Sequence, residues 1–382
     1  MPRDKSTPEG PAAAAELDAF REDPGNANLF VELHKALKKR GDATALAELL
    51  ELRSEHESDD TRAAKHLAEA AECRLGIGDT SGAESAFRQA LERDPAQNRA
   101  ASRFGDYLVE RKRYAEAAAV LESEVATLAG RAEAARSDED EKEPLAGRRA
   151  NRHAALARLW EQSLGRVDKA LLHWQRAWQL EPSRTDALEA ARAIYGSLGD
   201  DAMVIRLYQA ELGVLGDKGT ASHRAGLHLA IGRLQIKNKE IEGAATSLEE
   251  ALKLEPTSSV MRETLADLYA SPAFAEQKAR QQRAASLFVD LGQDWLRKHK
   301  LDDAIRFLRR ALGVDPFSRS AAADLEKALK LAERWDELDR LYRHLAGIVR
   351  ESDERIELGL RRCVLYRDHL DDRNSYKEAL AE

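Results

Sequence analysis

The stretch that decides the fold is GAATSLEEALKLEP, residues 243–256. Its apolar residues recur at spacings of four, three and one: Ala244, Leu248, Ala251 and Leu252. These spacings place the four side chains on one face of a helix, and the small alanines let another helix come close. Pro256 ends the run, because proline cannot continue the backbone hydrogen-bond ladder. We therefore expect an amphipathic helix that must bury this face against a neighbour.

A second amphipathic helix is expected just ahead of it, over residues 228–237, with Gly232 at the closest contact between the two. Together they form a helix–turn–helix of about 34 residues, 225–258. Neither helix buries its apolar face alone, so the unit must stack on copies of itself.

Copies of this unit occur elsewhere in the chain. Three further stretches carry the same order of small, large, Ala and Pro positions: AFRQALERDP (86–95), KALLHWQRAWQLEP (169–182) and DAIRFLRRALGVDP (303–316). Glycines stand at the equivalent of Gly232 in two other units: Gly105 and Gly292. This pattern resembles the tetratricopeptide repeat family. The resemblance implies an all-α fold, an α-solenoid of stacked helix–turn–helix repeats forming a right-handed superhelix, with a groove lined by the first helix of each repeat.

The repeat pattern also predicts how the chain is divided. We expect a disordered N-terminus at 1–12, repeats over 13–131, an acidic insertion or linker at 132–150, repeats over 151–352 and an incomplete repeat at 353–382. The acidic run 138–143 is typical of a solvated loop, and an acidic docking segment is the alternative. The incomplete last repeat would expose apolar surface. It indicates either a piece of a longer protein, which we favour, or an end covered by another subunit.

Composition limits the class of protein. Charged residues make up 34% and aromatic residues 5% of the 382, and the net charge of −8 is spread along the chain. This gives no case for binding nucleic acid or an anionic membrane, and no apolar run reaches the length of a membrane span. Cys73 and Cys363 stand alone, which is typical of thiols in a reducing cytoplasm.

Motifs for catalysis, cofactors or metals are not found in the sequence, so we expect no catalytic residue, no cofactor and no metal site. His223 and His228 are five residues apart and fall on different helical faces. His173 lies off the apolar face and is expected to be exposed or bridging. Trp174 fits a core position, whereas Trp178, one turn beyond it, is a candidate for contact with a partner.

The function predicted from these observations is a non-catalytic protein–protein interaction scaffold that binds a partner segment in the groove. The candidate contact residues are Lys35, Lys38, Lys39, Arg99, Arg103, Leu159, Trp178 and Arg233. The groove is predicted to be basic at its N-terminal end and apolar in the middle, which would match an amphipathic segment with acidic residues at one end. The alternative is that the lysines are solvated and neighbouring helices fill the apolar positions.

Two other functions remain open at this point. The chain would serve as a regulatory or substrate-recruiting arm of an enzyme whose catalytic domain lies beyond residue 382, or it would associate with itself through the ends of the solenoid.

Overall fold

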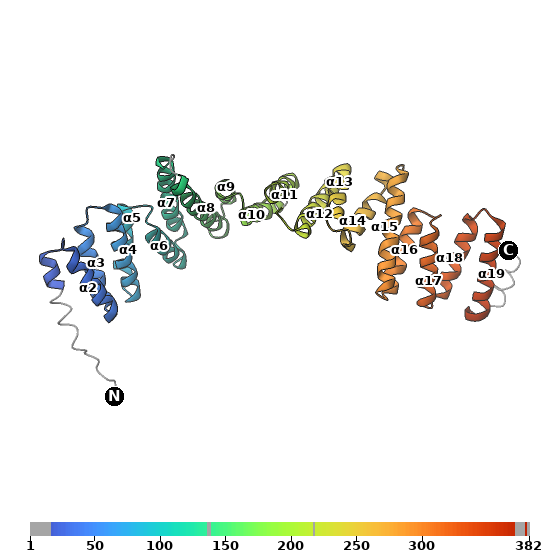
Figure 1. The fold of residues 1–382 in the computed structure, drawn as a ribbon, viewed down its shortest axis with the longest axis horizontal. Helices are drawn as coiled ribbons and strands as arrows, with labels where there is room; N and C mark the ends of the chain where they lie inside the picture. The colour runs from blue at the N-terminus through green and yellow to red at the C-terminus, as the bar shows by residue number, and fades with distance from the viewer. Residues whose placement is uncertain (1–16, 136–138, 217, 371–378, 380–382) are drawn as a thin grey trace, which may run out of the picture. The chain divides into compact units, whose positions relative to one another are not determined.

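The computed structural model describes residues 17–135, 139–216, 218–370 and 379, and among these residues every regular element is helical. The predicted disordered segment 1–12 lies outside the described residues. The chain divides into two compact units, unit 1 at 1–199 and unit 2 at 200–382. The fold is an all-α arrangement of stacked helix pairs, as the sequence predicts (Figure 1).

Unit 1 begins with a helical segment at 17–22. It continues with α2 (Ala27–Arg40), α3 (Ala43–Glu55), α4 (Asp60–Gly76), α5 (Thr80–Arg93), α6 (Asn98–Glu110), α7 (Tyr114–Ala134), α8 (Glu139–Gln162), α9 (Val167–Leu180) and α10 (Thr185–Ser197). Each helix packs on the next one in the chain, and α4 also contacts α6. The first helices of the pairs are α2, α4, α6 and α8. The second helices are α3, α5, α7 and α9.

Unit 2 contains α11 (Asp201–Leu215), α12 (Ala221–Lys237), α13 (Ile241–Leu254), α14 (Ser259–Tyr269), the 3₁₀ turn η1 (Pro272–Phe274), α15 (Lys278–Arg297), α16 (Leu301–Val314), α17 (Arg319–Leu331), α18 (Trp335–Ile348), α19 (Ser352–Leu365) and the π-helical turn η2 (Tyr366–Leu370). The pairs α12–α13, α15–α16 and α17–α18 follow the repeat pattern. One continuous apolar core joins α12 to α19.

Glycine allows the closest approach of the two helices within a pair. A Cβ atom added to Gly232 would lie 2.8 Å from Leu248 Cγ, and one added to Gly292 would lie 2.6 Å from Leu308 Cγ. Both distances are shorter than a van der Waals contact, so the predicted close contact at Gly232 is confirmed. At Gly105 the corresponding atom would lie 3.8 Å from Leu121 Cδ2, which leaves room for it.

The turn inside each helix pair places one residue in the left-handed region of backbone space. In three pairs of unit 1 this residue is glycine: Gly41 (φ 73°), Gly78 (φ 82°) and Gly165 (φ 63°). In four other pairs it carries a side chain: Lys112 (φ 60°), Lys239 (φ 65°), His299 (φ 56°) and Glu333 (φ 54°). The geometry of the turn is thus constant, while the residue that adopts it is not.

Buried ion pairs join the second helix of one pair to the first helix of the next. Glu124 of α7 is fully buried, and its carboxylate lies 2.6 Å from Arg148 Nη2 and 2.7 Å from Arg152 Nε of α8. In unit 2, Arg362 Nε of α19 donates to Asp339 Oδ1 of α18 at 3.0 Å, and both residues are buried. Glu124 has these two partners only when the two helix pairs are neighbours, whereas Asp339 also pairs with Arg343 of its own helix α18.

Two structural observations bear on the segment 132–150 and on the division of the chain. The segment 132–150 is not a solvated loop in its described part, because α7 runs to Ala134 and α8 starts at Glu139 and packs on α7. A run of acidic residues is compatible with a helix start, where the backbone N–H groups carry positive partial charge. The boundary between units falls instead after Gly199, inside the predicted repeat 185–218.

Candidate partner-binding surfaces

Charged side chains of the predicted groove form ion pairs between the first helices of unit 1. Lys38 Nζ of α2 lies 3.2 Å from Glu69 Oε1 of α4, and His34 Nε2 lies 3.4 Å from the same oxygen. Lys35 and Lys39 are exposed, and within the described residues neither forms an ion pair. The basic end of the groove is therefore reduced to these two lysines.

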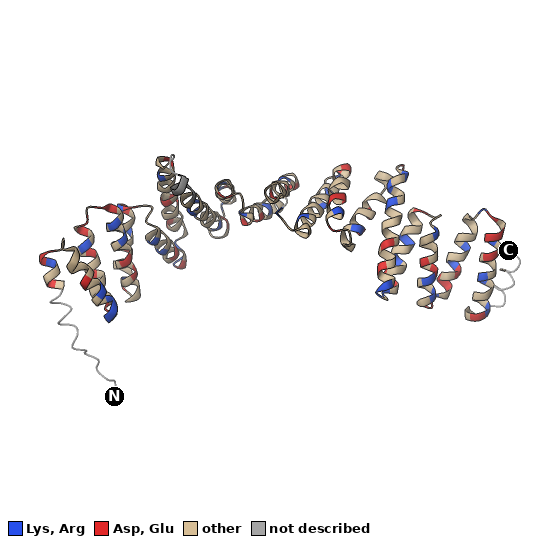
Figure 2. Ribbon diagram, viewed as in Figure 1, with Lys and Arg blue, Asp and Glu red and all other residues tan. Residues whose placement is uncertain are grey.

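The next pair of first helices repeats this arrangement. Arg99 and Arg103 of α6 both pair with Glu72 of α4, with Arg103 Nε 3.3 Å from Glu72 Oε1. The hydrogen bond from Arg99 holds the pKa of Glu72 below its ordinary value. Figure 2 shows acidic and basic residues interspersed on these helices. The predicted basic end of the groove thus also contains two acids of α4, Glu69 and Glu72.

The other predicted contact residues lie apart from these. Leu159 of α8 is only 8% exposed and packs in the core of unit 1, so it offers little surface to a partner. Trp178 lies on the second helix α9, is half-buried, and its indole Nε1 has no hydrogen-bond partner among the described residues. Arg233 is exposed on α12 and belongs to unit 2. Within unit 1, Leu159 and Trp178 thus lie on α8 and α9, and the cations lie on α2 and α6.

A pocket that the sequence analysis missed lies in unit 2 between the first helices α17 and α19. Its cavity volume is about 670 Å³, and the apolar side chains of Leu345, Ile348 and Leu358 line it. Phe317, which follows the end of α16, lines its edge and is 71% exposed. Ion pairs bridge the two helices: Arg319 Nη2 to Glu354 Oε1 and Arg361 Nη1 to Glu326 Oε2, both at 2.9 Å. The pocket therefore has an apolar lining and a charged rim that is largely neutralised.

An apolar stripe runs along α19 on residues that do not line this pocket. It consists of Ile356 (62% exposed), Leu360 (57%) and Val364 (47%), at spacings of four that place them on one face. We call these three residues the α19 stripe. The spacing of four is visible in the sequence, and Leu358 and Cys363 of the same helix pack inward.

Two further observations concern chemistry. His173, predicted to be exposed or bridging, is buried and bridges to the neighbouring helix: its Nδ1 lies 3.0 Å from Nδ1 of His153. Among the described residues, no group of three or more His, Cys, Asp or Glu side chains is placed to hold a metal ion. In the same part of the chain, none of the helices combines the length and apolarity needed to cross a membrane.

Comparison with known proteins agrees with the repeat pattern. The family model described as "Tetratricopeptide repeat" matches residues 225–258. No curated protein matches the sequence. Similar solved structures include the MamA RS-1 ArsTM double mutant (19% identity, 60% of this chain and 95% of that chain covered, TM-score 0.28). A second is pilF of Pseudomonas aeruginosa (17% identity, 67% of this chain and 99% of that chain covered, TM-score 0.31). A third is a tetratricopeptide repeat protein from Parabacteroides merdae (17% identity, 70% of this chain and 98% of that chain covered, TM-score 0.29).

The unit at 225–258 is α12–α13, the same unit from which the sequence pattern starts. Its packing glycine, its apolar face and its terminal proline recur in the helix pairs around it. Residues 225–258 thus match the tetratricopeptide repeat, and helix pairs with a similar packing pattern surround them.

Proposed function

We propose that this protein is a non-catalytic interaction scaffold whose first helices bind a segment of a partner protein. Two features of α17–α19 carry the proposal: the apolar pocket with the exposed Phe317 in its lining, and the α19 stripe on another face of α19. Phe317, Ile356, Leu360 and Val364 are each exposed to about half or more. Exposed apolar side chains that follow one another along a helix face mark a protein-binding surface, whereas scattered ones do not.

The occupant that fits this surface is an amphipathic segment. Its apolar side chains would enter the pocket over Leu345, Ile348 and Leu358, and others would cover the α19 stripe. The cations Arg319 and Arg361 already pair with acids of the neighbouring helix. The recognition of this part of the partner therefore depends on apolar contact more than on charge.

Unit 1 offers a different chemistry. Lys35 and Lys39 are exposed on α2, and Val31, one turn ahead of Lys35, is 62% exposed. We propose that this end of α2 binds acidic residues of a partner. The two unpaired thiols, Cys73 and Cys363, are consistent with a protein of a reducing compartment such as the cytoplasm.

A capture experiment with matched variants tests the apolar surface. The full-length chain is immobilised, and partners from the source organism are compared for the wild type and for Ile356→Asp/Leu360→Asp. We expect the double variant to lose the captured partner. Leu198→Asp, at a leucine 64% exposed at the end of α10 in unit 1, controls for the loss of an exposed apolar residue and should retain it.

Retention of the partner by the double variant would refute binding at the α19 stripe. A concentration series in multi-angle light scattering identifies the other possible occupant. If the wild type forms dimers that the double variant does not, a second copy of the chain covers the stripe. In that case the surface serves self-association and the proposal of a partner segment is wrong.

The acidic contact is tested by salt dependence. Lys35→Glu/Lys39→Glu should weaken binding and make the affinity less dependent on salt concentration. Salt weakens binding by screening ionic contacts, and the variant has fewer such contacts to screen. Lys278→Glu/Lys300→Glu, at two exposed lysines of unit 2, makes the same change in net charge as a control. If both double variants weaken binding equally, the effect comes from the net charge of the chain, and a specific site on α2 is excluded.

A further inference from the structure

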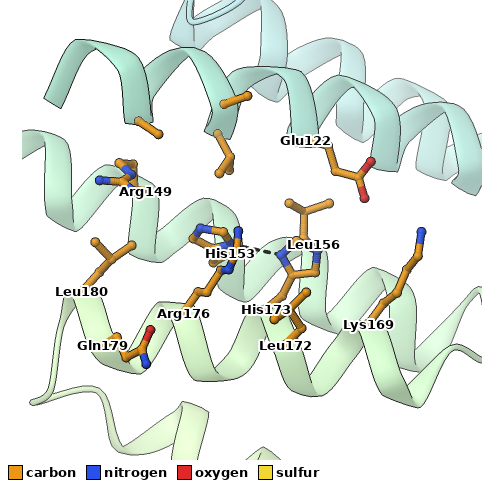
Figure 3. A pocket seen from close by; sticks show the side chains of 13 residues that line it. Glu122, Arg149, His153, Leu156, Lys169, Leu172, His173, Arg176, Gln179 and Leu180 are labelled. Carbon is orange, nitrogen blue, oxygen red and sulfur yellow. Dashed lines mark hydrogen bonds between the residues drawn. The ribbon is translucent and has the colours of Figure 1, made fainter. Parts of the chain in front are cut away.

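A second pocket lies in unit 1, between the second helices α7 and α9, with α8 at its base (Figure 3). Its cavity volume is about 540 Å³, which is within the range of sites for small ligands. It is separate from the surfaces described above, because the walls are second helices and none of the proposed partner contacts lines it.

Two buried histidines meet in this pocket. His153 of α8 is 2% exposed and His173 of α9 is 8% exposed, and their Nδ1 atoms are 3.0 Å apart. One ring must therefore donate its Nδ1–H to the other, and the accepting ring, if neutral, carries its proton on Nε2. Burial, with the nearby His173, Arg176 and Arg149, lowers the pKa of His153 to about 4. Burial also lowers the pKa of His173. At neutral pH the pair is uncharged.

Three cations line the same pocket: Arg149 of α8, and Lys169 and Arg176 of α9. The lining contains one acid, Glu122 of α7, which is exposed. Figure 3 shows Glu122 and Lys169 on the side of His173, and Arg149 on the other side of His153. Within the described residues none of the three cations forms an ion pair, although Lys169 Nζ lies 3.8 Å from the ring centre of Trp160. The pocket thus concentrates positive charge that the described acids do not neutralise.

A buried donor in this pocket also lacks an acceptor. Arg149 Nε is buried and has no hydrogen-bond partner among the described residues. Leaving a charged donor buried and unsatisfied is unfavourable, so such groups are usually paired in the functional state. An anion in the pocket would supply the acceptor and would balance the positive charge at the same time.

We propose that this pocket binds an oxyanion, a carboxylate or a phosphate group, that carries a short apolar portion. Arg149 and Arg176 bind the anion, and the histidine pair supplies a further N–H donor. Leu156, Leu172 and Leu180 line the pocket and contact the apolar portion. The anion belongs either to a free small molecule or to an acidic side chain of a protein.

Binding is coupled to the charge of the histidines. A bound anion attracts an imidazolium and offsets the repulsion from Arg149 and Arg176, so it raises the pKa of His153. Arg176 and Lys169 both lower the pKa of His173, while Glu122 opposes them. The pKa measured by NMR with the ligand bound should therefore be higher than without it, and the affinity should not decrease as the pH is lowered.

Titration calorimetry on the full-length chain at low ionic strength tests the site with three probes: inorganic phosphate, octanoate and a hexaglutamate peptide. We expect saturable binding of at least one probe. Octanoate or phosphate would identify a free small anion as the ligand class, and binding of the peptide alone would identify an acidic protein segment. No binding of any probe would overturn the proposal.

Variants locate the binding. Arg176→Gln should weaken it by about tenfold or more, because a hydrogen bond to a charged group is lost. Arg176 is exposed, so this change should leave the melting temperature nearly unaltered, and Arg149→Gln serves as a second variant. Arg206→Gln, at an exposed arginine of α11, removes the same charge elsewhere and should leave binding unchanged. Equal affinity for wild type and Arg176→Gln, or a His153 pKa that does not rise with the bound probe, would refute the assignment.

Discussion

Gly232 and Gly292 are the residues at which the packing of a helix pair is tightest. Gly232→Ala would place a methyl group against the fully buried Leu248, and Gly292→Ala would do so against Leu308. Alanine favours the helix by about 1 kcal/mol over glycine, but overpacking costs roughly 1–3 kcal/mol. We expect both variants to be destabilised by about 1 kcal/mol in urea unfolding.

Gly105→Ala is the matched control, since the added atom would meet Leu121 only at an ordinary contact distance of 3.8 Å. Here the helix preference acts alone, so the variant should be as stable as the wild type or more stable by up to about 1 kcal/mol. If all three variants shift stability equally, the close contact at Gly232 does not determine the packing.

The histidine pair makes the stability of unit 1 depend on pH. The ordinary pKa of histidine is 6.5, whereas that of the folded His153 is about 4. Between these values the unfolded state binds more protons, so the free energy of unfolding decreases as the pH falls from 6.5 to 4, and the full contribution is present above 6.5.

The double variant His153→Leu/His173→Leu should show a smaller loss of stability over this pH range, measured as the urea midpoint. His344→Leu, at an exposed histidine of α18, makes the same substitution outside the pair, and this variant should lose as much stability over the pH range as the wild type does. An unchanged pH dependence in the double variant would show that the pair is protonated in the folded state as readily as in the unfolded one.

At the scale of elements, the turn between the two helices of a pair carries backbone strain wherever it lacks glycine. In the folded state, a residue with a side chain is strained by about 1–2 kcal/mol in the left-handed region, and glycine removes this strain. Glycine also makes the unfolded chain more flexible, which offsets about 0.4–1 kcal/mol of the gain. Lys239→Gly, His299→Gly and Glu333→Gly should therefore each raise the free energy of unfolding by roughly 0.5–1 kcal/mol.

The neighbouring position supplies the control for this prediction. Asn238 has φ −81°, an ordinary conformation, so Asn238→Gly gains no relief of strain and should destabilise unit 2. In thermal unfolding, the melting temperature of Lys239→Gly should be higher than that of the wild type, and that of Asn238→Gly should be lower. A decrease in both would mean that the turn does not hold Lys239 in the left-handed region.

These elements show which features a single sequence predicts. The apolar faces and the terminal prolines follow local rules of spacing, and the structure confirms them. The left-handed turns at Gly41 and Gly165 fall on glycines, whereas those at Lys112 and Glu333 carry no such local signal in the sequence. In the segment 132–150, charge alone does not distinguish a loop from the start of a helix such as α8.

The candidate surfaces were harder to predict, because they depend on pairs of residues far apart in the sequence. Glu72 neutralises Arg99 and Arg103 only because α4 lies beside α6. His153 and His173 meet across two helices, and a search for closely spaced histidines does not find them. The α19 stripe is local, and its spacing of four could have been read from the sequence.

At the scale of the whole molecule, the division into two units predicts where the chain tolerates a cut. Fragments 1–199 and 200–382 follow the boundary, and each should give a helical circular dichroism spectrum with a cooperative melt. A cut at 144/145 falls inside α8 and separates part of that helix from α9, so fragments 1–144 and 145–382 should be less helical in sum than the intact chain.

The helicity of the four fragments also shows which outcome contradicts this division. If the fragments cut at 144/145 keep full helicity while those cut at 199/200 unfold, the chain divides in the acidic segment instead. The measurement thus decides between the two boundaries.

The buried carboxylate of Glu124 constrains how such a chain could evolve or be rearranged. Repeat proteins are often treated as interchangeable modules that are duplicated, deleted or shuffled. Glu124 of α7 has its cations on α8, so a different repeat inserted between these helices would leave a buried charge unpaired, which costs about 3–5 kcal/mol. Duplication or exchange should therefore be tolerated at junctions without such a pair and rejected at this one, which gives the repeats of unit 1 a fixed order.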